Sequence, residues 1–404
     1  MFEVDGVKYV PVSPSERTCD AIDCAYNESA ENIHIGNTVT NMGISLTVQQ
    51  IHPYALYNNG HIKNVELEFN GNIGDYAFYG CDSLENIVLG EQITSLGECV
   101  FQNCSKLQSI TIPDAVQTLG SYAFSGCSSL ASAKIGSGIK TVEPNTFLNC
   151  SSLSEIEIPQ SVEKVDNSVF AGCRKLQKVV MADGTTELQL GSNGSNPMFA
   201  DCPLNTVYIG RNISYNTDSG YGYSPFYRNT SLTTVTITDV ETEIPDNEFY
   251  GCTSLKNVTI GDGVTTIGDW AFSGCSSLDY FEFGSAVKTI GKEAFSDCTA
   301  MTRLISHAVT PPVCGSQALD DINKWACTLS VPQSYATAYQ QAEQWKEFFF
   351  INDDVSGISG AVNTDTGAVT VYSIDGRKLI MEKEDLNSLP SGIYIVNGKK
   401  CVVK

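Results

Sequence analysis

Cysteines recur along this chain at an interval that suggests chemistry. Nine of them form a column in which most successive members are 23 residues apart. Deprotonated thiols serve proteins as nucleophiles, redox pairs and metal ligands, so the column could in principle be a row of reactive sites. Its members are Cys81, Cys104, Cys127, Cys150, Cys173, Cys202, Cys252, Cys275 and Cys298.

Two asparagines stand in register with these cysteines and favour an architectural role instead. Asn59 and Asn229 occupy the position at which the repeat expects Cys. Asparagine cannot act as a nucleophile, a redox thiol or a disulfide partner, but from a small inward position it can hydrogen-bond the backbone. We therefore interpret the column as buried, reduced thiols placed where each coil bends into its strand.

Cysteines outside the column allow disulfides if the protein is exported, because an oxidising compartment permits them. Sequence alone does not fix their connectivity. A disulfide that caps the chain between Cys314 and Cys327 is the pairing we single out as a hypothesis. The pairs with suitable positions are Cys19 with Cys24, Cys99 with Cys104, and Cys314 with Cys327.

Signatures of catalysis are missing from the sequence. The four histidines are scattered, and neither H-E-x-x-H nor C-x-x-C occurs to hold a metal or a dithiol pair. No G-x-S-x-G elbow, phosphate-binding loop or calcium-binding loop is present. Pairs of carboxylates are frequent, but in so acidic a chain they do not indicate a glycosidase. We predict no catalytic residue, no metal site and no cofactor.

The composition also bounds the class of protein. With 46 Asp and Glu against 24 Lys and Arg, the 404-residue chain has a formal charge of −22, which repels phosphate backbones and anionic lipids. We expect no binding to nucleic acid, and no transmembrane segment because no long apolar run exists. Residues 355–404 hold five acidic and six basic side chains, so the acidity belongs to the preceding part. This difference indicates two modules.

A 23-residue repeat supplies the elements that would position the cysteines. A phenylalanine precedes each Cys or Asn position by three residues, with Leu56 in the first copy. About eleven copies are present, and this period is typical of a solenoid. Each copy then alternates as in "LENIVL" (84–89), which predicts a short strand with one buried face. We expect these strands to pair in parallel between coils, and two further apolar positions, twelve residues after and eight before the Cys, to fill the core.

The repeat unit resembles a known family. The segment "IGDYAFYGCDSLENIVLGEQITS" resembles the 23-residue leucine-rich repeat of BspA-like bacterial surface proteins, and the similarity extends from about Phe2 to Ile351. The resemblance implies a leucine-rich-repeat solenoid, a right-handed superhelix with a parallel β-sheet on its concave face. It also implies an N-terminal cap over 1–50, repeats over 51–305, and a C-terminal cap with a short helix over 306–354.

The same resemblance implies a function. BspA-like proteins are exported, non-enzymatic adhesins, so the expected partners are host extracellular or cell-surface proteins or other bacterial surfaces. The expected location is extracellular or on the bacterial cell surface, although "FEVDGVKYV" follows Met1 without a recognisable signal. The sequence fits either a protein that stays in the cell or a mature form whose signal was removed. Two alternatives remain open: a carbohydrate-binding protein that uses exposed tyrosines, and a structural spacer without a specific ligand.

Residues 355–404 show a different pattern from the repeats. "VTVYSIDGRKLI" and "GIYIVNGKKCVVK" alternate apolar and polar residues, and Asp375-Gly376 and Asn397-Gly398 are typical hairpin turns. We predict a small antiparallel β domain. It resembles the sorting-type β domains of secreted bacterial proteins, and a stalk or end cap is the alternative.

Two outward residues of each predicted strand should form columns along the sheet. Small hydroxyl side chains dominate both columns and suit an exposed sheet with or without a ligand. We expect the larger or charged members to mark a binding surface: Glu155, Glu157, Tyr208, Tyr280 and Glu282.

The 23-residue rhythm breaks over residues 183–225. The inserted stretches are rich in Gly, Asn, Ser and Tyr, which predicts loops or hairpin extensions that project from adjacent coils. Tyr215, Tyr221 and Tyr223 could form a recognition patch there, since aromatic residues are enriched at interfaces. The carbohydrate alternative would use these three with Tyr208 and Tyr280 as stacking platforms. The other interpretation is a surface loop that binds no ligand.

Overall fold

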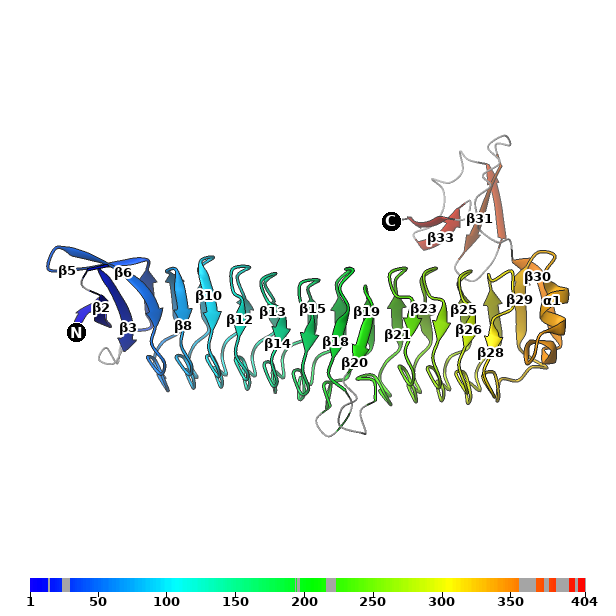
Figure 1. Cartoon of the computed structure of the whole chain (residues 1–404), viewed down its shortest axis with the longest axis horizontal. Coiled ribbons are helices and arrows are strands. Elements are labelled where there is room, and N and C mark those ends of the chain that lie inside the picture. Colours follow the sequence, from blue (N-terminus) through cyan, green and yellow to red (C-terminus); the bar gives the residue numbers. More distant parts are fainter. Residues whose placement is uncertain are drawn as a thin grey trace. The chain divides into compact units, whose positions relative to one another are not determined.

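The computed structural model describes residues 1–13, 15–23, 30–192, 194, 197–215 and 223–355, and the backbone of strands at 368–373, 378–382, 392–396 and 399–403. The chain divides into two compact units, Met1–Val355 and Ser356–Lys404, which are described separately. The first unit is a stack of coils, coloured from blue to orange in Figure 1.

Each coil of the first unit adds one strand to a first series of parallel strands. Residues one repeat apart lie side by side, as in the pairing of Glu155 with Lys178 and of Lys178 with Thr206. The predicted solenoid is thus confirmed, with about 13 turns. The series comprises β4 (Asn32–Gly36), β7 (Asn64–Glu68), β9 (Asn86–Leu89), β11 (Ser109–Thr111), β13 (Ser132–Lys134), β15 (Glu155–Ile158), β17 (Lys178–Met181), β19 (Thr206–Ile209), β21 (Thr234–Ile237), β23 (Asn257–Thr259), β25 (Tyr280–Phe283), β27 (Arg303–Ser306), β29 (Thr328–Pro332) and β30 (Phe350–Val355).

A second series of short parallel strands forms another wall of the coils, and the repeat pattern did not predict it as a sheet. Its residues include the apolar positions eight before each Cys, such as Leu96 and Val142, which are buried. The series comprises β6 (Ile44–Ile51), β8 (Gly71–Ile73), β10 (Ile93–Leu96), β12 (Thr118–Leu119), β14 (Thr141–Val142), β16 (Lys164–Val165), β18 (Leu188–Leu190), β20 (Ile213–Tyr215), β22 (Glu243–Ile244), β24 (Thr266–Ile267), β26 (Thr289–Ile290) and β28 (Val313–Cys314).

The N-terminal end of the stack is closed by antiparallel hairpins. β1 pairs with β2, β2 with β3, and β5 with β6, whereas β3 joins β6 in parallel and so continues into the second series. The edge of the first coil is therefore covered by strands of a different topology, as a solenoid end requires. These strands are β1 (Phe2–Val4), β2 (Val7–Ser13), β3 (Thr18–Asp23) and β5 (Thr38–Asn41).

Turn segments form the remaining wall and carry the phenylalanine and cysteine columns. The rings of successive coils stack from Phe78 to Phe295 with centroids 5.2–5.8 Å apart. Each column thiol donates a hydrogen bond to the carbonyl of the bulky residue one coil earlier, as Cys127 does to Phe101 (3.1 Å). Burial raises the pKa of the Cys127 thiol to about 12, so it stays protonated. All nine column cysteines are free thiols, as predicted, and eight of them are buried, whereas Cys202 is half-buried.

The two asparagines in register make a different hydrogen bond. The Asn229 Oδ1 accepts from the backbone N–H groups of Ser231 (3.0 Å) and Leu232 (3.1 Å), and Asn59 accepts in the same way from His61 and Ile62. The side chain therefore fixes the bend of its own coil, whereas Cys ties its coil to the preceding one.

The stretch 183–225 is more regular than predicted. β19 lies where the repeat predicts a strand. Parts of the two inserted stretches also form strands, β18 and β20, which pair with the strands of neighbouring coils. The prediction of projecting loops is wrong for these segments, because apolar residues such as Leu188 and Ile213 are buried in the core. The period is longer here, yet the described segments still complete coils.

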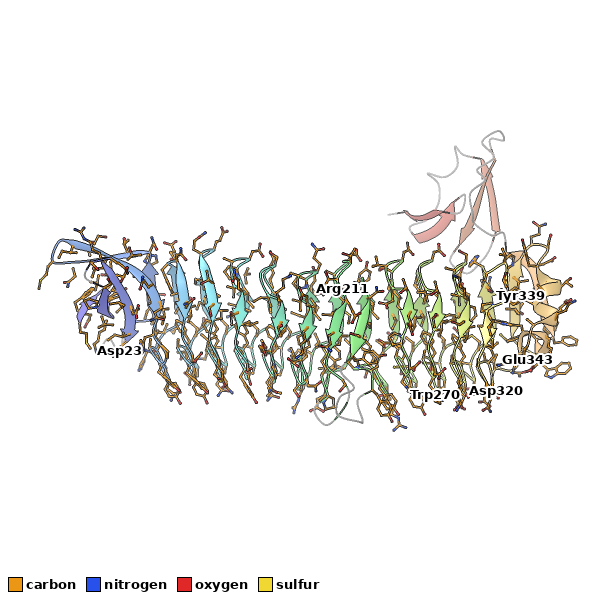
Figure 2. All side chains as sticks on the ribbon, in the orientation of Figure 1. Asp23, Arg211, Trp270, Asp320, Tyr339 and Glu343 are labelled. Carbon is orange, nitrogen blue, oxygen red and sulfur yellow. The ribbon has the colours of Figure 1, made fainter. Side chains whose placement is uncertain are left out.

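Arg211 lies fully buried within this stretch (Figure 2). Its guanidinium donates to the carbonyls of Pro159 (3.0 Å), Gln160 (2.8 Å) and Val162 (2.8 Å), which lie two coils away. The intervening coil passes close to this side chain at Gly184. A Cβ built on Gly184 would lie 3.6 Å from the Arg211 Cδ. Arg211 therefore ties its own coil to the coil two repeats earlier.

The C-terminal cap contains α1 (Ala336–Gln341) and the 3-10 turn η1 (Trp345–Glu347). The side chains of Tyr339 and Trp345 are fully buried, and Figure 2 places Tyr339 at the end of the coils. The Trp345 indole donates to the Pro312 carbonyl (2.8 Å). The short helix predicted around Trp345 thus lies in two pieces, and aromatic side chains seal the core.

The proposed disulfide between Cys314 and Cys327 is absent, and both are free thiols. The reason is topological: Cys314 ends β28 in the second series, whereas Cys327 directly precedes β29 in the first. Cys99 and Cys104 are also free. Cys24, the predicted partner of Cys19, lies outside the described residues.

The second unit contains an antiparallel sheet in the order β32-β31-β33-β34. β31 pairs with both β32 and β33, and β33 pairs with β34, which agrees with the predicted small antiparallel domain. The turn dipeptides at 375–376 and 397–398 lie outside the described residues. The strands are β31 (Ala368–Ser373), β32 (Lys378–Glu382), β33 (Gly392–Val396) and β34 (Lys399–Val403).

Candidate binding surface

The outward residues of the first strand series form the two columns that the sequence predicted. One runs through Glu155, Lys178, Thr206, Thr234 and Asn257 in unbroken register. The other runs two residues further along each strand. Apolar residues between them face the core, so the columns follow from the period of two in each strand. We call this surface the strand face.

The middle of the strand face brings together three of the predicted binding residues. Glu155 and Glu157 are exposed on β15, and Glu155 pairs with Lys178 on the next strand (3.3 Å). Tyr208 lies in the column of Glu157, two coils further on, and its hydroxyl donates to Asp183 (2.8 Å). That bond raises the pKa of Tyr208. The Glu155 carboxylate is therefore neutralised, whereas Glu157 remains available to a cationic partner.

Further along, Tyr280 and Glu282 belong to a connected cluster that the sequence did not reveal. The Tyr280 hydroxyl donates to Glu282, and the other oxygen of that carboxylate lies 2.5 Å from the His307 Nε2. The Arg303 guanidinium lies over the Tyr280 ring, 5.6 Å from its centroid. The hydrogen bond to His307 lowers the pKa of Glu282, so this half-buried carboxylate stays ionised. We call these four residues the Tyr280 cluster.

The register of neighbouring strands explains why this cluster forms. β25 pairs with β27, which puts Tyr280 opposite Arg303 and Glu282 opposite Ile305. His307 directly follows β27, and its ring lies within hydrogen-bonding distance of the Glu282 carboxylate. A signal existed in the sequence, because Arg303 lies one repeat after Tyr280 in the same column. Position alone, however, could not show which way these long side chains turn.

The three tyrosines of the inserted stretch do not form one patch in the described structure. Tyr215 is half-buried, and its hydroxyl donates inward to Glu248 (2.5 Å), so it is not a stacking platform. Tyr223 is 41% exposed but stacks on Tyr227 with ring centroids 4.2 Å apart. Tyr221 lies outside the described residues. The hydroxyls of Tyr208 and Tyr280 donate to the carboxylates of Asp183 and Glu282.

An exposed aromatic group that sequence reasoning missed lies on the turn wall. Tyr54 stacks on Tyr76 and Tyr57 on Tyr79, each pair with ring centroids 5.0 Å apart. Tyr54 and Tyr57 are about half exposed. Tyr54 and Tyr76 have positive φ, 64° and 58°, as do the equivalent residues of later coils such as Cys99 and Tyr122. We call Tyr54, Tyr57, Tyr76 and Tyr79 the tyrosine edge.

Other kinds of site were sought in the same part of the chain. Among the described residues, no group of three or more His, Cys, Asp or Glu side chains could hold a metal ion. Within the same residues, no helix has the length and apolar character needed to cross a membrane.

A comparison with solved structures gives several bacterial proteins. One match is a leucine-rich repeat protein from Bacteroides ovatus, which is 21% identical, with 85% of this chain and 98% of that chain covered and a TM-score of 0.42. A leucine-rich cell surface protein from Faecalibacterium prausnitzii is 20% identical, with 76% and 94% covered and a TM-score of 0.37. The pneumococcal vaccine antigen PcpA is 13% identical, with 89% and 98% covered and a TM-score of 0.36.

The family itself is identified by the repeats. A comparison with curated proteins gives no match. The family described as BspA type leucine-rich repeat region matches residues 32–81, 71–202 and 221–310, in six copies. These ranges cover the coils that carry the phenylalanine and cysteine columns. The chain belongs to the BspA-type leucine-rich-repeat family.

Proposed function

We propose that the chain is an exported, non-enzymatic adhesin that binds a protein on a host or bacterial surface through its strand face. The observation that carries this proposal is the pair of outward columns along the first strand series, together with the connected Tyr280 cluster on β25 and β27. Tyrosine and arginine on a rigid scaffold are the side chains that most often dominate protein interfaces. The BspA-type family supports a binding role in general terms.

The Tyr280 cluster is the proposed anchor because it is already ordered before a partner arrives. The Tyr280 hydroxyl, the Glu282 carboxylate and the His307 ring hold one another in place. A preorganised group loses less side-chain entropy on binding than isolated exposed residues do. The exposed Glu157 and the net charge of −22 favour a partner with basic side chains.

The proposal is tested by probing the full chain against an array of human extracellular and cell-surface ectodomains and against intact bacterial cells. For any partner found, Tyr280→Ala combined with Arg303→Ala should weaken binding at least tenfold, since loss of an interface anchor typically costs 2 kcal/mol or more, roughly thirtyfold. The control is Tyr54→Ala with Tyr57→Ala on the tyrosine edge, which should leave affinity within about twofold.

The control variant also tests the opposite assignment of the binding surface. If the tyrosine-edge variant lost binding while the Tyr280 variant kept it, the strand face would not be the binding surface. Binding that survived enzymatic deglycosylation of the partner would support protein recognition, and binding lost on deglycosylation would favour the carbohydrate alternative.

A further inference from the structure

One arginine breaks the pattern of the turn wall. The residue directly before each Cys or Asn position has a positive φ, between 56° and 76°. Glycine adopts this conformation freely, and Asn and Asp tolerate it better than other residues do. Arg228, with a φ of 56°, is the exception to this choice of residues, so its side chain and not its backbone accounts for its presence. The other coils have Asn58, Gly80, Asn103, Gly126, Asn149, Gly172, Asp201, Gly251, Gly274 and Asp297 at this position.

The Arg228 side chain lies across the following coil. A Cβ built on Gly251 would be 2.9 Å from the Arg228 Cγ, so the glycine leaves room for the arginine. Asparagine takes the same place over a glycine in three other coils, at Asn58, Asn103 and Asn149. The sequence thus puts a long cation where the fold otherwise uses a short neutral side chain.

Tyrosine rings hold the guanidinium in place. Its central carbon is 5.2 Å from the centroid of the Tyr227 ring and 5.8 Å from that of the Tyr250 ring, and the electron-rich rings attract the cation. Tyr223 and Tyr250 each stack on Tyr227, with centroids 4.2 Å and 4.9 Å from it. Arg228 is exposed and forms no ion pair with any residue that the structure describes. We call Tyr223, Tyr227, Arg228 and Tyr250 the Arg228 platform.

One side of the Arg228 platform is open. Tyr227 covers one face of the Tyr250 ring, and no other ring stacks on Tyr250 among the described residues. The next residue in the column of Tyr250 is Ser273, which is small and buried. Only backbone atoms of Gly251 lie within 4 Å of a Cβ built on Gly274, so no side chain covers the turn here. An exposed cation, the outer face of an aromatic ring and a bare turn therefore lie next to one another.

We propose that the Arg228 platform binds a glycan that ends in a single carboxylate-bearing sugar. The guanidinium donates two parallel N–H groups to the carboxylate, whose geometry it matches. The sugar ring packs its C–H face on Tyr250 above the bare turn, while its hydroxyl groups stay in water. The site lies on the turn wall and not on the strand face, so the inference does not depend on the proposed adhesin function.

The surrounding charge decides how many negative groups the ligand carries. Asp201 precedes Arg228 in its column, Asp297 follows the two glycines, and the chain as a whole has a charge of −22. A sulfated polysaccharide or a nucleic acid has a negative charge on nearly every unit and is repelled by this field. One carboxylate at the end of an otherwise neutral glycan pairs with Arg228 and brings no further charge near the acidic residues. This acid requirement separates the inference from the carbohydrate alternative, which relies on tyrosines alone.

The full chain is tested by calorimetric titration with sialyllactose, with lactose that carries a terminal glucuronic acid, and with lactose itself as the neutral comparison. We expect at least one acidic ligand to bind about tenfold or more tightly than lactose, because hydrogen bonds between charged groups are the strong ones. Arg228→Asn, which introduces the residue of three other coils, should lose this preference. Tyr250→Ser, which introduces the residue of the next coil, should weaken binding of the acidic ligand several-fold. The matched control is Arg174→Ala, an exposed arginine of an earlier coil, which should bind as the wild type does.

Circular dichroism and the unfolding midpoint report whether each variant is folded. Arg228→Asn should be at least as stable as the wild type, because asparagine tolerates the positive φ. The proposal is overturned if neither acidic ligand binds more tightly than lactose, or if Arg228→Asn binds the acidic ligand as the wild type does. It is equally overturned if heparin binds more tightly than sialyllactose, because the site would then select a high charge density. An equal loss of binding in Arg174→Ala would contradict the assignment to Arg228.

Discussion

The cysteine column shows how one residue type serves a repeat without any reactive chemistry. Each thiol is a small, apolar group that still donates one hydrogen bond, as Cys150 does to the Phe124 carbonyl one coil earlier (3.2 Å). Asparagine at the same position bonds within its own coil instead. The sequence could predict that the column is architectural, because Asn replaces Cys in register. It could not predict the bond between coils, which depends on where the neighbouring carbonyl points.

Thiol labelling tests the protection of the column. Because burial raises the pKa of Cys127 and Cys252 to about 12, iodoacetamide at pH 8 should leave the fully buried column cysteines unmodified in the native chain. In denaturant every cysteine should react. Mass spectrometry of tryptic peptides measures both, and rapid modification of Cys127 in the folded chain would contradict the assignment.

Arg211 offers a second test at the residue scale. Arg211→Ala removes three hydrogen bonds to backbone carbonyls and leaves a cavity, so the free energy of unfolding should fall by roughly 3–5 kcal/mol. Urea unfolding followed by circular dichroism measures the change. Arg228→Ala is the control, because Arg228 is exposed and should change stability by less than about 1 kcal/mol. Equal effects of the two substitutions would refute a special role for Arg211.

At the scale of elements, the sequence predicted the first strand series and its register because the period of two and the 23-residue repeat both act there. It did not predict the second series as a sheet, since strands such as β16 (Lys164–Val165) are too short to show alternation. It also missed the tyrosine edge, because the repeat pattern does not predict which turn residues are exposed and stack on one another. The strand-face columns were predictable from the sequence, whereas the directions in which the long side chains of the Tyr280 cluster point were not.

The coil of Glu241 and Glu248 predicts a pH dependence. Both pKa values are raised from 4.5 to about 8, so the folded state holds protons that the unfolded chain has lost. The stabilising contribution is complete below about pH 4.5 and is lost as the pH rises through about 8. The stability of the wild type relative to Glu241→Val with Glu248→Ala should therefore be lower at pH 9 than at pH 6. The groups facing the pair are Tyr215, Glu187, Glu243 and Asp246.

Thermal unfolding of both proteins across this pH range measures the difference directly. Carboxylates with lowered pKa values, such as Glu282, change stability with pH in the opposite direction. Because both proteins contain them, their contribution cancels when the stabilities of the wild type and the variant are compared. A constant difference between the wild type and the variant from pH 6 to pH 9 would show that the pair does not titrate as inferred.

At the scale of the whole molecule, the first unit is a linear stack of coils with a hydrophobic core inside and a long polar strand face. About 13 turns at a strand spacing of about 4.8 Å give a strand face roughly 60 Å long, enough for a partner protein to contact several coils. The acidity of the chain lies in this unit, so basic partners are favoured along its length.

Hydroxyl-radical footprinting of the full chain, free and bound to a partner identified on the ectodomain array, tests the central claim most directly. If the strand face binds, oxidation of Tyr280 and His307 should fall several-fold in the complex, while Tyr54 and Tyr57 on the tyrosine edge react as in the free chain. Protection of Tyr54 and Tyr57 with unchanged oxidation of Tyr280 and His307 would contradict the account.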